Sequence, residues 1–239
     1  MKRLFIVILA LVASNLANAQ KDLVVDPNAE QRTMSASFNA IRVSSSIDLY
    51  LSQSDNEAVA VSAAEQRFKE HIKTEVENGV LRVYYDEKKF QLISGKKKLK
   101  VYVSFKKLDK LTVSGSSDVY VMGSIEGEVL TLEVSGSSGF NGKVKLDKLD
   151  ITASGSSDVH IQGSAGNANI ESAGSSDVKG YDLVTDMCTA KAAGSSDILI
   201  TVNKELNAHA SGSSDIYFKG AGLIRDMHSS GSSNISRKS

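Results

Sequence analysis

"SGSSDVYV", residues 114–121, decides the fold, because variants of its first six residues recur six more times along the chain. Every copy contains a glycine followed by two serines, and consecutive copies lie 18 to 21 residues apart. A period near twenty is typical of a solenoid, in which each coil buries its apolar face against its neighbours. Helical repeats usually need about 33 residues or more, so this period favours β-coils. The motif glycines are Gly115, Gly136, Gly155, Gly174, Gly194, Gly212 and Gly231.

Apolar columns appear on both sides of the motif when the copies are aligned. Apolar residues at every second position indicate strands that turn one face inward. Four residues before the glycines stand Leu111, Leu132, Ile151, Ile170, Ala190, Ala208 and Met227. Four residues after them stand Val119, Phe140, Val159, Val178, Ile198, Ile216 and Ile235. Each coil therefore has one strand before the motif and one after it, and the variable stretch between motifs supplies a third side.

Parallel crossovers of this kind are overwhelmingly right-handed. We therefore predict an all-β protein, a right-handed parallel β-helix with three sides and 19–20 residues in each coil. Gly-Ser-Ser is its structural corner, because glycine adopts backbone angles that other residues avoid. The serines are small, and their hydroxyl groups can bond to the turn or to the adjacent coil.

An aspartate follows the two serines in five of the seven copies, and by parity its side chain points outward. We interpret this column as a cap on the N–H groups of the turn. The alternative is a calcium ladder, because calcium-binding β-rolls also stack aspartate beside glycine, although their period is nine residues. The residues of the column are Asp118, Asp158, Asp177, Asp197 and Asp215.

The N-terminal part is less regular than the repeats. "FNAIRVSSSIDLYL", residues 38–51, is a degenerate copy that places Ile41 and Leu49 in register with Leu111 and Val119. Residues 52–110 interrupt the stack. We expect a strand at 58–63, two helical turns at 64–72, a mobile loop at 87–98 and a strand at 98–105. Asn78-Gly79 lies between two alternating runs and predicts a β-hairpin at 72–87.

Residues 1–19 have the three-part pattern of a secretory signal peptide. Lys2 and Arg3 precede an apolar run, and Ala17-Asn18-Ala19 forms an A-x-A cleavage site. The apolar run is shorter than the ~20 residues that span a bilayer, so we expect export and no membrane span in the mature chain. The chain then divides into the signal peptide (1–19), an extension (20–36), the irregular β part with the degenerate coil (37–110) and the regular solenoid (111–239).

The chain has 28 basic and 28 acidic residues, so its formal net charge is zero and nothing favours nucleic acid as a partner. Cys188, the lone cysteine, stands at an apolar position and is expected in the core. His209 and His228 share one outward column and are expected to be surface residues. The sequence contains no metal-ligand spacing such as H-E-x-x-H and no phosphate loop, so we expect no cofactor.

The entry "F-x-x-I-x-V-S-x-S-I-D-L", the element "TEVENGVLRV", the passage "LKVYVSFKKLDKLTVSGSSDV" and the repeated G-S-S-D together resemble one known family. It is the head GIN domain of auto-transporter adhesins, a domain of unknown function in exported proteins of Gram-negative bacteria. The similarity covers residues 37–235. It implies a β-helical, adhesin-like protein in the periplasm or at the cell surface, with no catalytic residues to transfer.

Three functions are consistent with these observations. The first is a non-enzymatic module that presents the solenoid surface to an envelope protein or a glycan. The second is a polysaccharide-active β-helix enzyme of the pectate-lyase type, which would need convergent titratable groups in a cleft. The third is a purely structural envelope protein. The outward column that contains Tyr120, His160, Lys179 and Tyr217 is a candidate ligand face.

Overall fold

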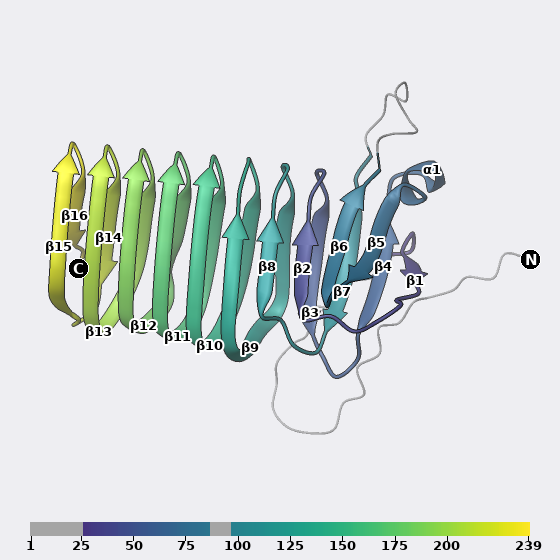
Figure 1. Ribbon diagram of the computed structural model, residues 1–239, viewed down its shortest axis with the longest axis horizontal. Helices are drawn as coiled ribbons and strands as arrows, with labels where there is room; N and C mark the ends of the chain where they lie inside the picture. Colours follow the sequence, from purple (N-terminus) through teal and green to yellow (C-terminus); the bar gives the residue numbers. More distant parts are fainter. Residues whose placement is uncertain (1–25, 87–96) are drawn as a thin grey trace, which may run out of the picture.

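The computed structural model describes residues 26–86 and 97–239, which form one elongated stack of β-coils (Figure 1). The predicted signal peptide, residues 20–25 of the extension and residues 87–96 of the predicted mobile loop lie outside the described residues. A single sheet system of 16 strands runs through the described part of the chain, and the one helix in it has four residues. The all-β prediction is confirmed.

The repeats form the regular half of the stack. Each coil runs up one side, bends at Gly-Ser-Ser and descends on the other, as a right-handed parallel β-helix (Figure 1). The strands are β8 (Lys110–Val113), β9 (Asp118–Val134), β10 (Gly139–Gly155), β11 (Asp158–Gly174), β12 (Asp177–Gly194), β13 (Asp197–Gly212), β14 (Asp215–Lys219), β15 (Leu223–Gly231) and β16 (Asn234–Arg237).

The coils stack in the register that the repeat predicts. Val159 of β11 lies between Phe140 of β10 and Val178 of β12, and Asp158 lies beside Asp177. Farther along each coil, the pairing register between neighbouring strands shifts. The shift lies between His160 and Gly163 in β11 and at the equivalent positions of β10 and β12. A second break in the inward–outward alternation precedes the strand that leads to the next motif. These two breaks and the Gly-Ser-Ser bend give the coil its three sides.

Glycine is required at the corners because neighbouring corners almost touch. All seven motif glycines have a positive φ, between 65° and 86°. A Cβ atom on Gly174 would lie 2.7 Å from the carbonyl oxygen of Gly155, and one on Gly155 would lie 2.7 Å from that of Gly136. That oxygen also accepts the N–H of the serine above, as in the 2.8 Å bond from Ser175 to Gly155. Any side chain here would push adjacent coils apart.

The second serine of the motif is buried in the six copies up to Ser214, with an exposed fraction of 2% or less. In the later copies its hydroxyl group forms hydrogen bonds within its own turn and to the backbone of the preceding coil. Ser196 donates to the carbonyl oxygens of Ala193, at 3.0 Å, and Ser172, at 2.9 Å, and it accepts the N–H of Ala193. Ser214 repeats this arrangement one coil further on.

The degenerate copy forms a coil of the same stack. Its strands are β2 (Ala40–Val43) and β3 (Asp48–Gln53), and they pair in parallel with β8 and β9. Ile41 lies opposite Leu111 and Leu49 opposite Val119, which is the predicted register. Ser45, in the place of the motif glycine, still has a positive φ of 72°.

Residues 52–110 do more than interrupt the stack. They include β6 (Val80–Tyr85) and β7 (Lys100–Phe105), which pair in parallel with the outer edges of β2 and β3. The expected strand at 98–105 therefore exists as β7, but it does not lead directly into the first regular coil. It extends the stack in the opposite direction, and the chain then crosses back to β8. Sequence order and stacking order differ here because β2 and β3 leave an unpaired edge on each side.

Antiparallel strands close this end of the stack. β5 (Ile72–Glu77) and β6 form the predicted hairpin, with positive φ at Asn78 and Gly79. β4 (Ala58–Ser62) covers β7, and β1 (Glu30–Arg32) covers β4. The helical turns predicted at 64–72 are the short α1 (Gln66–Lys69), whose Phe68 is buried.

We expect Gly174→Ala to destabilise the chain by about 2–4 kcal/mol, because a positive φ is strained for alanine and its Cβ would meet the backbone of Gly155. Urea unfolding would measure the change. Gly127→Ala is the control, since its Cβ would have no closer neighbour than a methyl group of Leu146 at 3.9 Å. Equal stability of the two variants would contradict the role of the corner.

Ser196→Ala should cost about 1–3 kcal/mol, because it leaves the part-buried N–H of Ala193 and the carbonyl oxygens of Ala193 and Ser172 without this partner. Thermal and urea unfolding would test this. The neighbouring Ser195 is exposed, and Ser195→Ala should change stability far less. A neutral result for Ser196→Ala would show that the serine ladder does not hold the corners.

Candidate functional site

The candidate site is the outward surface of the strands that follow each corner, because this surface is flat and runs along the whole stack. We call it the outer face; it consists of the outward residues of β7, β3, β9 to β14 and β16. The first outward residue of each repeat supplies the aspartate column. Two residues later a second column runs beside it. This second column contains Tyr102, Tyr50, Tyr120, Asn141, His160, Lys179, Leu199, Tyr217 and Ser236.

The predicted ligand residues Tyr120, His160, Lys179 and Tyr217 all lie in this second column, but they do not form one cluster. Tyr120 and His160 are separated by Asn141 of β10. His160 and Lys179 are neighbours on β11 and β12. Leu199 of β13 separates Lys179 from Tyr217. The column is therefore a strip for extended contact.

Three stacked tyrosines form the aromatic end of this strip, here called the tyrosine ladder. The ring of Tyr50 lies between those of Tyr102 and Tyr120, with centroid distances of 5.1 Å and 5.3 Å and interplanar angles near 22°. Tyr120 is the most exposed of the three residues, with an exposed fraction of 37%. Sequence reasoning missed Tyr102 because β7 was not assigned to a coil. The triplets LYL (49–51), VYV (101–103) and VYV (119–121) were the signal that could have revealed the ladder.

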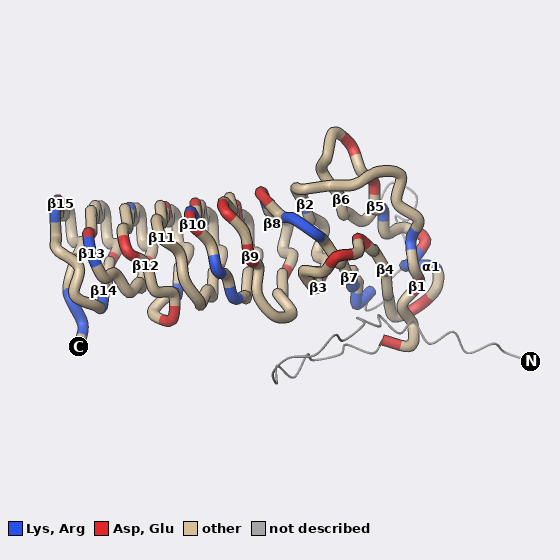
Figure 2. Tube along the Cα trace, turned by 90° about the horizontal axis from the view of Figure 1, so that it is seen from below, with Lys and Arg blue, Asp and Glu red and all other residues tan. Residues whose placement is uncertain are grey.

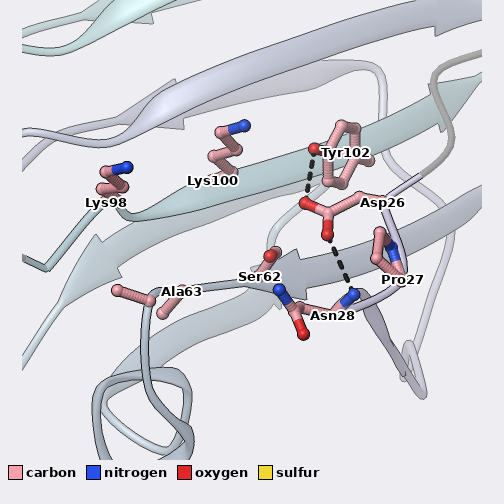
Figure 3. A pocket seen from close by; sticks show the side chains of 9 residues that line it. Asp26, Pro27, Asn28, Ser62, Ala63, Lys98, Lys100 and Tyr102 are labelled. Atoms are coloured by element: carbon pink, nitrogen blue, oxygen red, sulfur yellow. Dashed lines mark hydrogen bonds between the residues drawn. The ribbon is translucent and has the colours of Figure 1, made fainter.

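A shallow hollow of about 300 Å³ adjoins the ladder at Tyr102 (Figure 3). Figure 3 shows Lys98 and Lys100 on one side of it and Asp26 on the other, with the tyrosine hydroxyl pointing at the carboxylate. The hydroxyl of Tyr102 donates to Asp26 at 2.8 Å, and the backbone N–H of Asn28 donates to the other carboxylate oxygen at 2.9 Å. The hollow is lined by Asp26, Pro27, Asn28, Ser62, Ala63, Ala64, Lys98, Lys100 and Tyr102.

Protein donors compensate the charge of Asp26. Burial raises its pKa, but bonds from Asn28, Tyr102 and Ser62 outweigh burial, so the pKa lies below its usual value. Burial and the bond to Asp26 raise the pKa of Tyr102, which therefore stays a donor. Within the described residues, neither Lys98 nor Lys100 forms a salt bridge to a carboxylate. The hollow thus presents two cationic groups beside an aromatic surface.

The aspartate column finds its partners within the protein. The ammonium group of Lys179 lies 3.1 Å from Asp158 and 3.5 Å from Asp177, so it bridges two coils. Asp215 accepts the hydroxyl of Tyr217 at 2.7 Å. No group of three or more histidine, cysteine, aspartate or glutamate side chains in the described ranges could hold a metal ion. Lysine, hydroxyl and N–H groups contact the carboxylates of Asp158, Asp177 and Asp215.

Crowding of like charges affects Asp197. Its pKa is raised by burial first and then by the carboxylates of Asp177 and Asp215 in the adjacent coils. Burial and the carboxylate of Asp118 raise the pKa of Asp48 in the same way. Neighbouring carboxylates of the column therefore repel each other in part.

Cys188 and the histidine pair take the places expected of them. Cys188 is buried in an inward column, and burial raises the pKa of its thiol to about 12, so the thiol stays protonated. His209 and His228 lie side by side on β13 and β15 with ring centroids 6.5 Å apart. Asp226 approaches His209 at 3.3 Å.

Basic and acidic residues are interspersed along the stack, without a long run of one sign (Figure 2). None of the helices within residues 26–86 and 97–239 has the length and apolar character needed to cross a bilayer.

The family described as "Putative auto-transporter adhesin, head GIN domain" matches residues 37–222 of this chain. No curated protein matches the sequence. A "putative adhesin" from Bacteroides fragilis has a similar structure, with a TM-score of 0.82 and 21% identity over 88% of this chain and 96% of its own. A "putative lipid binding protein" from Parabacteroides distasonis follows, with a TM-score of 0.69 and 22% identity over 89% and 97%. At these identities the similarity shows the shared β-solenoid fold.

Asp197→Asn should stabilise the chain at neutral pH by about 0.5 kcal/mol, because it removes a charge from between two like charges. The pKa of Asp197 is raised in the folded state, so its ionisation lowers stability as the pH rises through that pKa. The gain should vanish below about pH 3.9, where the carboxyl group is protonated in both states. Urea unfolding across this range would measure it. Asp182→Asn, outside the column, is the control, and an identical pH profile for both variants would refute the crowding.

Proposed function

The chain belongs to the head GIN domain family, and on this premise we propose that it is an exported, non-enzymatic interaction module of the cell envelope. It presents its outer face to an envelope protein or a glycan of a Gram-negative bacterium. The pattern of residues 1–19 supports export. The adhesin names of several structural relatives fit the same role.

The tyrosine ladder beside Lys98 and Lys100 is the observation that carries this proposal. Aromatic rings on a rigid sheet contribute large contact area with little loss of conformational entropy. The ammonium groups of Lys98 and Lys100 beside them add attraction for carboxylate or sulfate groups of a partner. Tyrosine is among the residue types that dominate the energy of many binding surfaces.

The hollow lacks the arrangement that polysaccharide cleavage requires. Acid–base cleavage of a glycosidic bond uses two carboxylates that flank the bond. Asp26 is the one carboxylate among the residues that line the hollow, and Tyr102 and Asn28 hold it. The five stacked aspartates are spread along a flat face instead of converging in a cleft. Geometry therefore favours binding over catalysis.

A screen of glycans and envelope proteins with residues 20–239 tests the proposal. We expect saturable binding by the wild-type chain, and we expect Tyr120→Ser and Lys100→Ser each to weaken it about tenfold, the factor for about 1.4 kcal/mol. Tyr84→Ser is the matched control, because Tyr84 is a tyrosine of the hairpin on another side of the stack.

The screen is run with calcium and with EDTA, and products are examined for cleavage. Binding that is unaffected by EDTA agrees with an aspartate column held by protein donors, whereas loss in EDTA would restore the calcium ladder. Absence of any saturable partner would favour a structural envelope protein. Cleaved glycan would establish the enzyme instead.

A further inference from the structure

The two ends of the stack differ in whether further elements cover the outermost coil. At one end, β4, β5 and α1 cover the outermost parallel coil. At the other end, β15 and β16 are the outermost strands, and no described residue pairs with their free edges (Figure 1). The last coil exposes large apolar side chains there: the exposed fractions of Leu223, Ile224 and Met227 are 65%, 44% and 52%.

Ile224 and Met227 are core residues that lack a cover. Ile224 follows Leu206 in one inward column, and Met227 follows Ala208 in another. Leu206 and Ala208 are fully buried because the next coil lies over them. A free strand edge with apolar side chains is a template for pairing with another strand.

Arg237 covers only part of this end. Its guanidinium group lies over the ring of Phe218 at 5.1 Å and donates to the carbonyl oxygens of Gly220 and Gly222 at 2.7 Å each. Ile224 and Met227 are left outside this cover.

We propose that this end is the interface of a symmetric dimer, in which β15 and β16 of one chain pair antiparallel with β15 and β16 of a second copy. The occupant is a second copy because the edge is complementary to itself in one register. A two-fold axis also closes the assembly after two chains. The opposite end does not offer a matching parallel edge for head-to-tail growth, since β4 and β5 lie antiparallel to β7 and β6 there.

Charge selects the register along β15. Side chains of Asp226 and His228 point outward beside Asn207 and His209, whereas Met227 points inward. A pairing centred on Met227 places Asp226 of each chain opposite His228 of the other. Shifting the centre to Asp226 would oppose two carboxylates, and a centre midway between two residues would place inward side chains opposite outward ones.

The same axis serves β16. Met227 precedes Gly231 by four residues and Ile235 follows it by four, so they occupy matching inward positions on the two sides of the coil. An axis through Met227, perpendicular to the sheets, therefore also passes close to Ile235. Both apolar residues then meet their own copies, and the two hydrogen-bond ladders continue across the junction.

This axis leaves the outer faces of both chains on the same side. The two tyrosine ladders would lie at the far ends of one long platform. Two sites on one rigid body raise the avidity for a surface that carries repeated ligands. The dimer does not depend on the proposed function, since its interface lies apart from the ladder.

Sedimentation over a range of concentrations tests the dimer. We expect the wild-type chain of residues 20–239 to reach twice the mass of one chain. Met227→Glu should remain a monomer, because two glutamates would face each other on the axis. Met187→Glu is the matched control: its side chain is exposed to a similar degree, 45%, but lies at a lateral corner. A monomeric wild type, or equal dissociation of both variants, would overturn the proposal.

A cysteine variant tests the register independently. Residues that lie directly opposite each other in antiparallel strands have the Cα separation that a disulfide requires. Met227→Cys should therefore cross-link to a dimer under mild oxidation, whereas Met187→Cys should not. The native Cys188 is buried and does not interfere. Failure of Met227→Cys to cross-link, in a chain with native circular dichroism, would refute the two-fold register.

Discussion

The structure depends on the close approach of one glycine to the next at every corner. From Gly136 to Gly212 the carbonyl oxygen of each corner glycine accepts an N–H from the coil above, and it lies within 2.8 Å of where a Cβ of the next glycine would be. Hydrogen bonding and van der Waals exclusion act on the same atom. Together these two effects fix the separation between adjacent coils. At this separation, equivalent inward and outward residues of successive coils lie directly above one another.

The buried serines complete this constraint, because a corner without a side chain still leaves polar backbone groups to satisfy. Ser196 and Ser214 bond both to their own turn and to the coil below. Each coil is thereby completed by its neighbour, so a coil at a free end lacks part of its partners. The stack solves this problem at one end with antiparallel strands. At the other end it leaves Met227 and Ile224 uncovered.

Regular stacking also explains the chemistry of the outer face. Identical outward positions lie side by side, so a repeated residue type becomes a column with shared properties. For aspartate this produces repulsion, which lysine and N–H groups offset in part. For tyrosine it produces stacked rings at the spacing of the coils. The face therefore becomes a rigid strip suited to contact with an extended partner.

The sequence by itself determined the repeat, the right-handed parallel β-helix and its corner glycines. It also determined the degenerate coil at Ile41 and Leu49 and the hairpin at Asn78-Gly79. All of these follow from local periodicity or turn chemistry, which a short window of residues carries. The tertiary structure alone decided that β6 and β7 extend the stack in the reverse direction. It therefore also decided that Tyr102 completes the ladder and borders the hollow with Asp26 and Lys98. Which free edge a strand pairs with depends on long-range contacts, and no local pattern encodes that choice.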